Sequence, residues 1–285
     1  MKIIKATLMI LLLIISGCEK KDNDGLYQLP NQSYSQMMSY IIEDNGKTIV
    51  IDGGTEKDMN YLINNIKKVS DDNVVDAWFL THYHKDHTGA LAKYLSSNKD
   101  DIKINSIYYN FPKDAWVKKY EKNRYQDYLT INNSLELFKN KHITYRKNEY
   151  IFGDIIIKNL RTFNPSITSN SGNNSSTVFK CMINNTSMLF LGDLGVEGGN
   201  ELIELSSKEI KNTDYVQIAH HGQAGVNQDV YKIINPKYCL WPTTDWLWEN
   251  KEKIYKTDET KQWIGELNVR KNYVAKDGLI HIKIK

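Results

Sequence analysis

The chain has 285 residues, of which 41% are hydrophobic and 25% charged, and this is the composition of an ordinary globular protein. A formal net charge of only +3 gives no indication of a nucleic-acid-binding protein. The length suits one large domain or two small ones.

The first residues have the features of a secretion signal. A basic start precedes an apolar run from Leu8 to Ile15, which is too short for a membrane-spanning helix but typical of a signal peptide. The following Ser16-Gly17-Cys18 resembles a bacterial lipobox, in which Cys18 becomes the lipidated first residue. An ordinary signal peptide that contains a cysteine is the alternative.

This interpretation divides the chain into three parts. We expect a lipoprotein signal peptide at 1–17, a polar tether at 18–30 and one folded domain at 31–285. Removing residues 1–17 deletes two lysines and no acids, so the net charge falls to 35 − 34 = +1. The predicted location is the cell envelope outside the cytoplasm, with lipid on Cys18 holding the domain at a periplasmic or outer membrane face.

The middle of the chain alternates between strand-rich and helix-rich regions. Asn45-Gly46 between two apolar runs predicts a hairpin, and so do Asn184-Asn185 and Asp277-Gly278. Apolar residues at helical spacing predict a helix around 59–66. Strand-rich halves that are each backed by helices favour a layered α/β sandwich over an alternating doubly wound sheet. The two cysteines that follow Cys18 are far apart, and either a disulfide or two buried free thiols fit them.

Residues 77–91 hold three of the seven histidines within six positions. His82, His84, Asp86 and His87 follow an apolar strand and precede a predicted helix with Thr88 as its N-cap. We therefore expect them in a loop, where active-site residues are commonly presented. Imidazoles and a carboxylate without thiolates suit zinc, manganese or iron. A solvated polar loop is the alternative.

Two later apolar strands also end in potential metal ligands. Asp193 follows the run 188–191, and His220 and His221 follow the run 215–219. Three buried strands thus deliver metal-binding residue types to their ends, which argues against a merely polar loop. His142 and His281 lie within predicted strands and are interpreted as surface or packing residues.

The motif Thr81-His-Tyr-His-Lys-Asp-His87 resembles the HxHxDH signature of the metallo-β-lactamase superfamily. The supporting segments match in order over roughly residues 39–284. The resemblance implies an αββα four-layer sandwich and a hydrolase that uses one or two zinc ions, with manganese or iron as alternatives. The metal ligands that it implies are His82, His84, Asp86, His87, Asp193 and His220.

The resemblance also implies a role for each ligand. His82 and His84 are expected to bind a first ion and Asp86 and His87 a second, with Asp193 bridging the two. His220, preferred over His221, is expected to complete the second ion. His221 would then support the ligands or contact substrate, and Asp52 would orient the site.

Within the superfamily the chain looks most like the hydrolase domain of ComEC-type DNA-uptake proteins. Residues 173–179, 189–193 and 214–225 carry this likeness. One departure stands out: many members have another histidine between the first cluster and the bridging aspartate. Here that interval contains only His142, in a predicted strand, and residues 173–176 occupy the corresponding part of the chain. The first ion is therefore expected to be weakly held.

These features predict a metal-activated water that attacks the substrate. We expect Asp86 to orient this water, His221 to assist, and Asn174, or its neighbours Asn173 and Ser175, to stabilise developing negative charge. The preferred substrate is a phosphodiester, in nucleic acid or in a phosphorylated envelope component, or another small molecule. A lactone or β-lactam hydrolase and a catalytically inactive metal- or substrate-binding lipoprotein are the alternatives. No stable protein partner is predicted.

Overall fold

The computed structural model of the protein describes residues 23–97 and 99–284. The predicted signal peptide, Cys18 and the first part of the predicted tether lie outside the described residues. No helix in the described part of the chain is long and apolar enough to cross a membrane.

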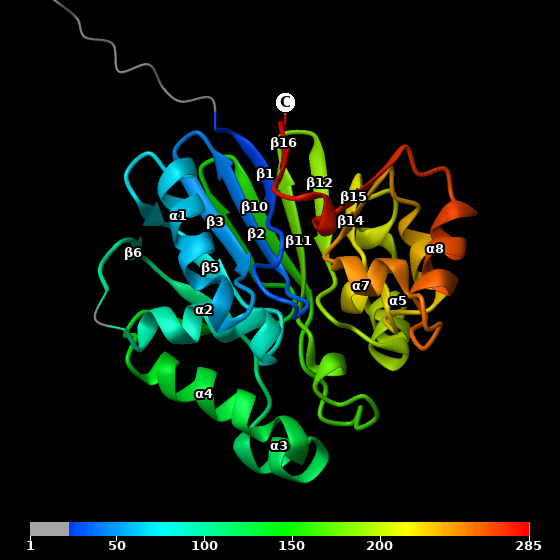
Figure 1. Cartoon of the computed structure of the whole chain (residues 1–285), viewed down its shortest axis with the longest axis horizontal. Coiled ribbons are helices and arrows are strands. Elements are labelled where there is room, and N and C mark those ends of the chain that lie inside the picture. The colour runs from blue at the N-terminus through cyan, green and yellow to red at the C-terminus, as the bar shows by residue number, and fades with distance from the viewer. Residues whose placement is uncertain (1–22, 98, 285) are drawn as a thin grey trace, which may run out of the picture.

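Two mixed sheets lie face to face at the centre of the molecule (Figure 1). Within the described residues, the first sheet has seven strands in the order β16-β1-β2-β3-β5-β7-β8. Its strands are β1 (Gly25–Gln28), β2 (Ser39–Asp44), β3 (Lys47–Asp52), β5 (Ala77–Phe79), β7 (Ile107–Tyr109), β8 (Lys141–Ile143) and β16 (Ile280–Ile282). The predicted hairpin at Asn45-Gly46 is confirmed, because β2 and β3 pair antiparallel around it.

The second sheet has the order β15-β14-β13-β12-β11-β10-β9 in the same part of the chain. Its strands are β9 (Glu149–Phe152), β10 (Ile155–Arg161), β11 (Val178–Ile183), β12 (Thr186–Phe190), β13 (Tyr215–Gln217), β14 (Tyr238–Trp241) and β15 (Lys271–Val274). Pairing is antiparallel from β9 to β12 and parallel from β12 to β15. The predicted Asn184-Asn185 hairpin joins β11 to β12. A separate two-stranded sheet pairs β4 (Val74–Val75) with β6 (Lys103–Ile104).

Helices cover the outer face of each sheet, which makes four layers (Figure 1). The first sheet is covered by α1 (Met59–Val69), α2 (Lys85–Leu95) and α4 (Tyr125–Glu136), with α3 (Asp114–Tyr120) beside them. The second is covered by α5 (Val196–Ile210), α6 (Gln228–Ile234), α7 (Asp245–Glu249) and α8 (Thr257–Gly265). The 3₁₀ turns are η1 (Glu56–Asp58), η2 (Lys122–Arg124), η3 (Asn173–Ser175), η4 (Ala219–Gly222) and η5 (Ala275–Asp277). The predicted αββα sandwich is confirmed.

Three apolar cores hold these layers together, one between each pair of neighbouring layers. The central core lies between the sheets, where Phe79 of the first sheet meets Phe179 of the second edge to face, with ring centroids 5.1 Å apart. Apolar strands buried on both faces end abruptly at polar loops, so the side chains just beyond them gather at one end of the sandwich. Cys181 and Cys239 are free, buried thiols of the second sheet.

Three details differ from the sequence-based expectations. Strand β1 belongs to the first sheet, so the folded part begins before residue 31, within the range 18–30 predicted as a tether. Strands β15 and β16, which flank Asp277-Gly278, lie in different sheets and do not form a hairpin. Helix α2 begins at Lys85 with His84 as its N-cap residue, so Asp86 and His87 occupy its first turn instead of a loop.

Candidate metal centre

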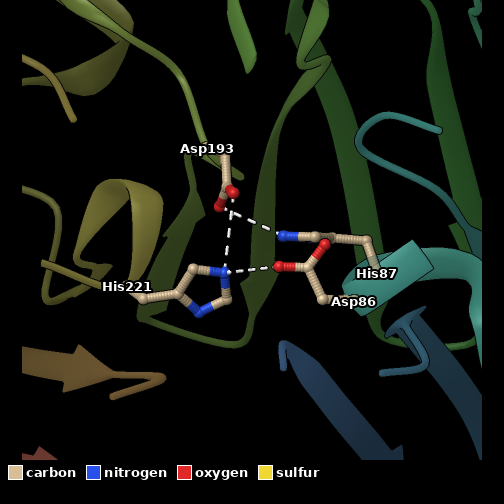
Figure 2. A group of neighbouring side chains, drawn as sticks. All are labelled: Asp86, His87, Asp193 and His221. Atoms are coloured by element: carbon tan, nitrogen blue, oxygen red, sulfur yellow. Dashed lines mark ion pairs between the residues drawn. The ribbon is translucent and has the colours of Figure 1, made fainter. Parts of the chain in front are cut away.

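Four side chains from three segments converge at the end of the sandwich (Figure 2). Asp86, His87, Asp193 and His221 each offer one ligand atom, and these atoms lie within 4.8 Å of one another. Nε2 of His87 is 3.1 Å from Oδ1 of Asp193. Nε2 of His221 is 3.5 Å from Oδ2 of Asp193 and 3.4 Å from Oδ2 of Asp86. We call these four residues the second set.

A neighbouring group consists of His82, His84 and Asp193, whose ligand atoms also lie within 4.8 Å of one another. We call these three residues the first set. Nε2 of His82 is 3.9 Å from Oδ2 of Asp193. Asp193, which is almost completely buried just beyond β12, is therefore shared by both sets, as the predicted bridging role requires.

The polar atoms that face this centre fit metal ions. Nε2 of His82, His87 and His221 and Oδ1 of Asp193 are buried and have no hydrogen-bond partner among residues 23–97 and 99–284. Leaving a buried polar atom unpaired costs about 1–3 kcal/mol. Four such atoms that point at one another, from imidazoles and a carboxylate, are the donor set that zinc, manganese or iron accepts.

The opposite ring nitrogens are held by neighbours, and this fixes which nitrogen faces the centre. Nδ1 of His87 lies 2.7 Å from Oδ2 of Asp52, and Nδ1 of His221 lies 2.8 Å from the Pro242 carbonyl oxygen. Both oxygens only accept hydrogen bonds, so each Nδ1 carries a hydrogen, and each Nε2 is the nitrogen that faces the centre and offers its lone pair once the ring is neutral. Such outer contacts are usual around metal-binding histidines.

Thr81 extends the same arrangement to His82. Its hydroxyl donates to Oδ2 of Asp52 at 2.7 Å and therefore accepts from Nδ1 of His82 at 3.1 Å. Asp52 also accepts from the Thr81 backbone N–H at 2.8 Å. It adopts a left-handed conformation with φ of +55°, which is strained for a residue other than glycine. Asp52 thus orients two histidines, one in each set, as its predicted role requires.

Burial and charge shift the pKa values of the centre in opposite directions. Burial lowers the pKa of His82. For His221 burial also acts to lower the pKa, but the carboxylates of Asp193 and Asp86 outweigh it and raise the pKa to about 9. The pKa of Asp193 is lowered despite its burial, because the imidazoles of His87 and His221 favour its charged form. Without metal, the carboxylates hold a proton on His221, and metal binding displaces it.

His220 belongs to neither of the two sets whose ligand atoms lie within 4.8 Å of one another. The structure brings His221 into the second set instead, against the preference for His220, because both residues have left-handed backbone conformations with φ of +50° and +54° and so direct their rings differently. Nε2 of His220 lies 3.9 Å from Oδ2 of Asp193 and accepts a hydrogen bond from Nδ2 of Asn173 at 3.3 Å.

Asn174 does not fit the predicted catalytic role. Its Oδ1 accepts from the backbone N–H groups of Gly195 and Gly198, and its Nδ2 donates to the Ser169 carbonyl and the Glu197 carboxylate. These four bonds tie η3 to the start of α5 and leave no donor for a substrate. Among the three residues proposed to stabilise charge, Asn173 is the one that reaches a histidine of the centre.

Glu121 was missed by the sequence analysis. It follows α3, and its Oε1 lies 3.1 Å from Nε2 of His84, while its Oε2 accepts from the Tyr83 hydroxyl at 2.7 Å and the Ser171 hydroxyl at 3.3 Å. Nε2 of His84 therefore carries the hydrogen, and Nδ1 is the atom left for a metal. Glu121 lies in a charged helical region far from the motif, and nothing in that pattern marks it.

The charged run around α3 is a solvated helix surface with local pairs. Lys118 forms an ion pair with Asp114 at 2.8 Å and lies over the Tyr125 ring, and Lys119 lies over the Tyr120 ring. Lys118 and Lys119 are thus held by neighbours on the same surface.

A four-layer αββα sandwich that carries a histidine- and aspartate-lined centre at the end of its sheets defines a class of metallohydrolases. The family model of the metallo-beta-lactamase superfamily matches residues 35–238, so the chain belongs to this superfamily and is a metallohydrolase of it. No curated protein matches the sequence significantly.

Solved structures share the fold. The metallo-beta-lactamase fold protein YhfI from Bacillus subtilis is 13% identical, with a TM-score of 0.53, and the match covers 91% of this chain and 100% of that one. CmlA, a diiron beta-hydroxylase from Streptomyces venezuelae, is 11% identical, with a TM-score of 0.56, and the match covers 92% of this chain and 54% of that one. At these identities the likeness concerns the fold alone.

Proposed function

We propose that the protein hydrolyses a phosphodiester with the help of zinc ions held by the two sets. The observation that carries this proposal is a hollow of about 290 Å³ that reaches the centre at Asp86. Lys85 and Arg124 line the same hollow, so two cationic side chains accompany the metal ligands. A phosphodiester carries a negative charge in both its ground and transition states, and cations beside the metal ions favour such a substrate.

An aromatic pair lines the same hollow. The Tyr34 and Trp246 rings stack with centroids 5.5 Å apart, and Nε1 of Trp246 donates to the Tyr34 carbonyl oxygen at 2.7 Å. Tyr34 is 79% exposed although it is a large aromatic residue. Exposed aromatic rings beside cations are the usual platform for nucleobases, so they support a nucleic-acid phosphodiester. The likeness of residues 173–179 and 214–225 to ComEC-type hydrolase domains supports the same substrate.

The residues of this chain divide the work between them. Metal ions bound by the two sets would supply an activated water and charge stabilisation. Asp193 belongs to both sets, and Asp52 and Glu121 fix the orientation of the histidines. Lys85 and Arg124, which line the hollow, would bind the phosphoryl oxygens.

We also propose that lipid on Cys18 anchors the protein at a periplasmic or outer membrane face. The basic start, the apolar run and the lipobox-like residues 15–18 support this location. Labelling of cells with a fatty-acid analogue should mark the wild type but not Cys18→Ser. A wild-type protein that stays unlabelled, or that retains residues 1–17, would contradict the proposal.

A substrate panel tests the activity. Zinc-loaded wild type should cleave bis(p-nitrophenyl) phosphate and single-stranded DNA, but neither a lactone nor nitrocefin, and His84→Ala and Asp193→Ala should be inactive. Lys85→Ala should raise KM for the phosphodiesters about tenfold, equivalent to about 1.4 kcal/mol, whereas replacing the exposed Lys232 of α6 by alanine should not. Cleavage of the lactone or nitrocefin alone would refute the phosphodiester substrate. Tight zinc binding without any activity would favour a binding protein.

A further inference from the structure

The first set lacks a ligand that the second set has. Asp193 is shared, and the second set adds Asp86, His87 and His221, whereas the first set adds only His82 and His84. The histidine between residues 87 and 193 is His142, and it cannot be the missing ligand because it lies exposed on β8 and hydrogen-bonds to Asn140. A further imidazole for the first set must therefore come from elsewhere in the chain.

Nε2 of His220 lies near the centre and is the ring nitrogen that can offer a lone pair. Its Nδ1 lies 3.3 Å from the carbonyl oxygen of Ala224, which only accepts, so Nδ1 carries the hydrogen. Nε2 is left unprotonated in the neutral ring, and it lies 3.9 Å from Oδ2 of Asp193. His82 approaches the same oxygen of Asp193 at the same distance, also through Nε2. The held outer nitrogen repeats the pattern of His87 and His221.

Contacts with one loop place His220 on the side of the first set. Asn173 donates to Nε2 of His220, and Gly172, directly before it, lies against Glu121 and the outer nitrogen of His84, a member of the first set. A Cβ atom on Gly172 would come within 2.4 Å of Nε2 of His84. The loop 172–173 therefore touches His84 on one side and His220 on the other. His221 contacts Asp86 of the second set instead.

The backbone between the two histidines separates their rings. His220, His221 and Gly222 all have positive φ, and this conformation is strained at the two histidines because they have a Cβ atom. The His221 carbonyl accepts from the Thr243 hydroxyl at 2.7 Å, which helps to hold the turn. Consecutive left-handed residues send adjacent side chains toward different sets, and a regular strand or helix would not place both at the centre.

We propose that His220 is the third imidazole of the first set, so that His82, His84 and His220 hold one ion and Asp86, His87 and His221 the other, with Asp193 shared. His220 would replace the histidine that the sequence lacks between residues 87 and 193, and its Nε2 lone pair, which accepts from Asn173 here, would be given to the ion instead. This proposal concerns metal ions and is independent of the substrate proposed above.

Metal counting tests the assignment without any substrate. The purified full-length protein is equilibrated at a chelator-buffered free zinc concentration, and bound zinc is measured by inductively coupled plasma mass spectrometry. Wild type and the exposed control His142→Ala should bind two ions per chain. His220→Ala and His82→Ala should each bind one ion. Loss of a direct ligand should lower the affinity for the ion at least 100-fold, because loss of an outer contact to a ligand already lowers it by up to about 100-fold. His220→Asn preserves the left-handed backbone, which asparagine tolerates, and should also bind one.

Two double variants identify which ion is lost. His82→Ala with His220→Asn should still bind one ion, because both residues serve the same set. His220→Asn with His221→Ala should bind none, because they serve different sets. If His220→Asn bound two ions with unchanged affinity, the proposal would be overturned. One remaining ion in the His220→Asn, His221→Ala double variant would also overturn it. So would a wild type that binds only one ion at every zinc concentration. Inactivity toward phosphodiesters with two ions bound would contradict only the proposed function.

Discussion

Replacing Glu121 by glutamine should weaken metal binding at the first set. Burial by itself raises the pKa of Glu121, but hydrogen bonds from His84, Tyr83 and Ser171 outweigh it and lower the pKa, so the residue is a charged carboxylate. Its two oxygens accept from three donors. A glutamine has one oxygen and an amide group that donates, so it leaves at least one of the three donors facing another donor.

The expected loss follows from the strength of these bonds. A hydrogen bond to a charged group contributes about 1.5–3 kcal/mol, and outer contacts of metal ligands typically contribute 10–100-fold in affinity. A hundredfold loss corresponds to about 2.7 kcal/mol, so the two ranges agree. We expect Glu121→Gln to raise the dissociation constant of the ion at the first set 10–100-fold. The dissociation constant of the other ion should change by no more than about threefold.

Competition with a chromophoric zinc chelator measures both dissociation constants. Glu136→Gln is the matched control, because Glu136 is an exposed acid on α4 whose ion pair with Lys141 spans 3.4 Å. Circular dichroism and thermal unfolding report whether the variants keep the fold. Unchanged affinity of both ions in a folded Glu121→Gln protein would refute the positioning role, and equal weakening of both ions would refute its assignment to His84.

Three further expectations concern stability. Burial raises the pKa of Glu43 to about 7, so between pH 4.5 and 7 the folded protein binds more protons than the unfolded chain, and its stability falls as pH rises. Glu43→Gln should abolish up to about 3 kcal/mol of this fall, measured by urea unfolding at pH 5 and 8. The same fall in unfolding free energy in the variant and the wild type would contradict this expectation. Phe79→Ala should cost about 3–5 kcal/mol, because the ring is buried between the sheets against Tyr108 and Phe179; a loss below 1 kcal/mol would mean that the core rearranges. Chelation should lower the melting temperature, since free zinc at 100 times its dissociation constant stabilises the fold by about 2.7 kcal/mol, and a melting temperature independent of zinc would exclude binding to the folded state.

The sequence predicted the parts of the site that depend on local order. His82, His84, Asp86 and His87 are close in the chain and follow a buried strand, so any compact fold keeps them together. Asp193 was found because it also follows an apolar strand, and strand ends in adjacent positions meet at one edge. The layered fold was predictable for the same reason, since its strands and helices have clear apolar patterns.

The rest depends on contacts that a linear pattern does not contain. The choice between His220 and His221 is made by two left-handed residues, which no composition rule marks outside glycine. Glu121 reaches His84 only because α3 packs beside the motif. The turn at Asp277-Gly278 has an ordinary hairpin sequence, yet it passes the chain from one sheet to the other, and only the partners of β15 and β16 decide this.

The position of β1 has a consequence for how the protein folds. Tyr27 pairs with His281 and their rings stack, so a strand near the start of the described chain lies between β2 and a strand near its end. The edge of β1 that faces β16 therefore has no backbone partner until almost all of the chain has been synthesised. Closing this pair spans nearly the longest sequence separation in the fold, which slows folding and leaves a strand edge open to other chains meanwhile. Shortening the chain before β16 should thus promote aggregation while leaving every ligand of the metal centre in place.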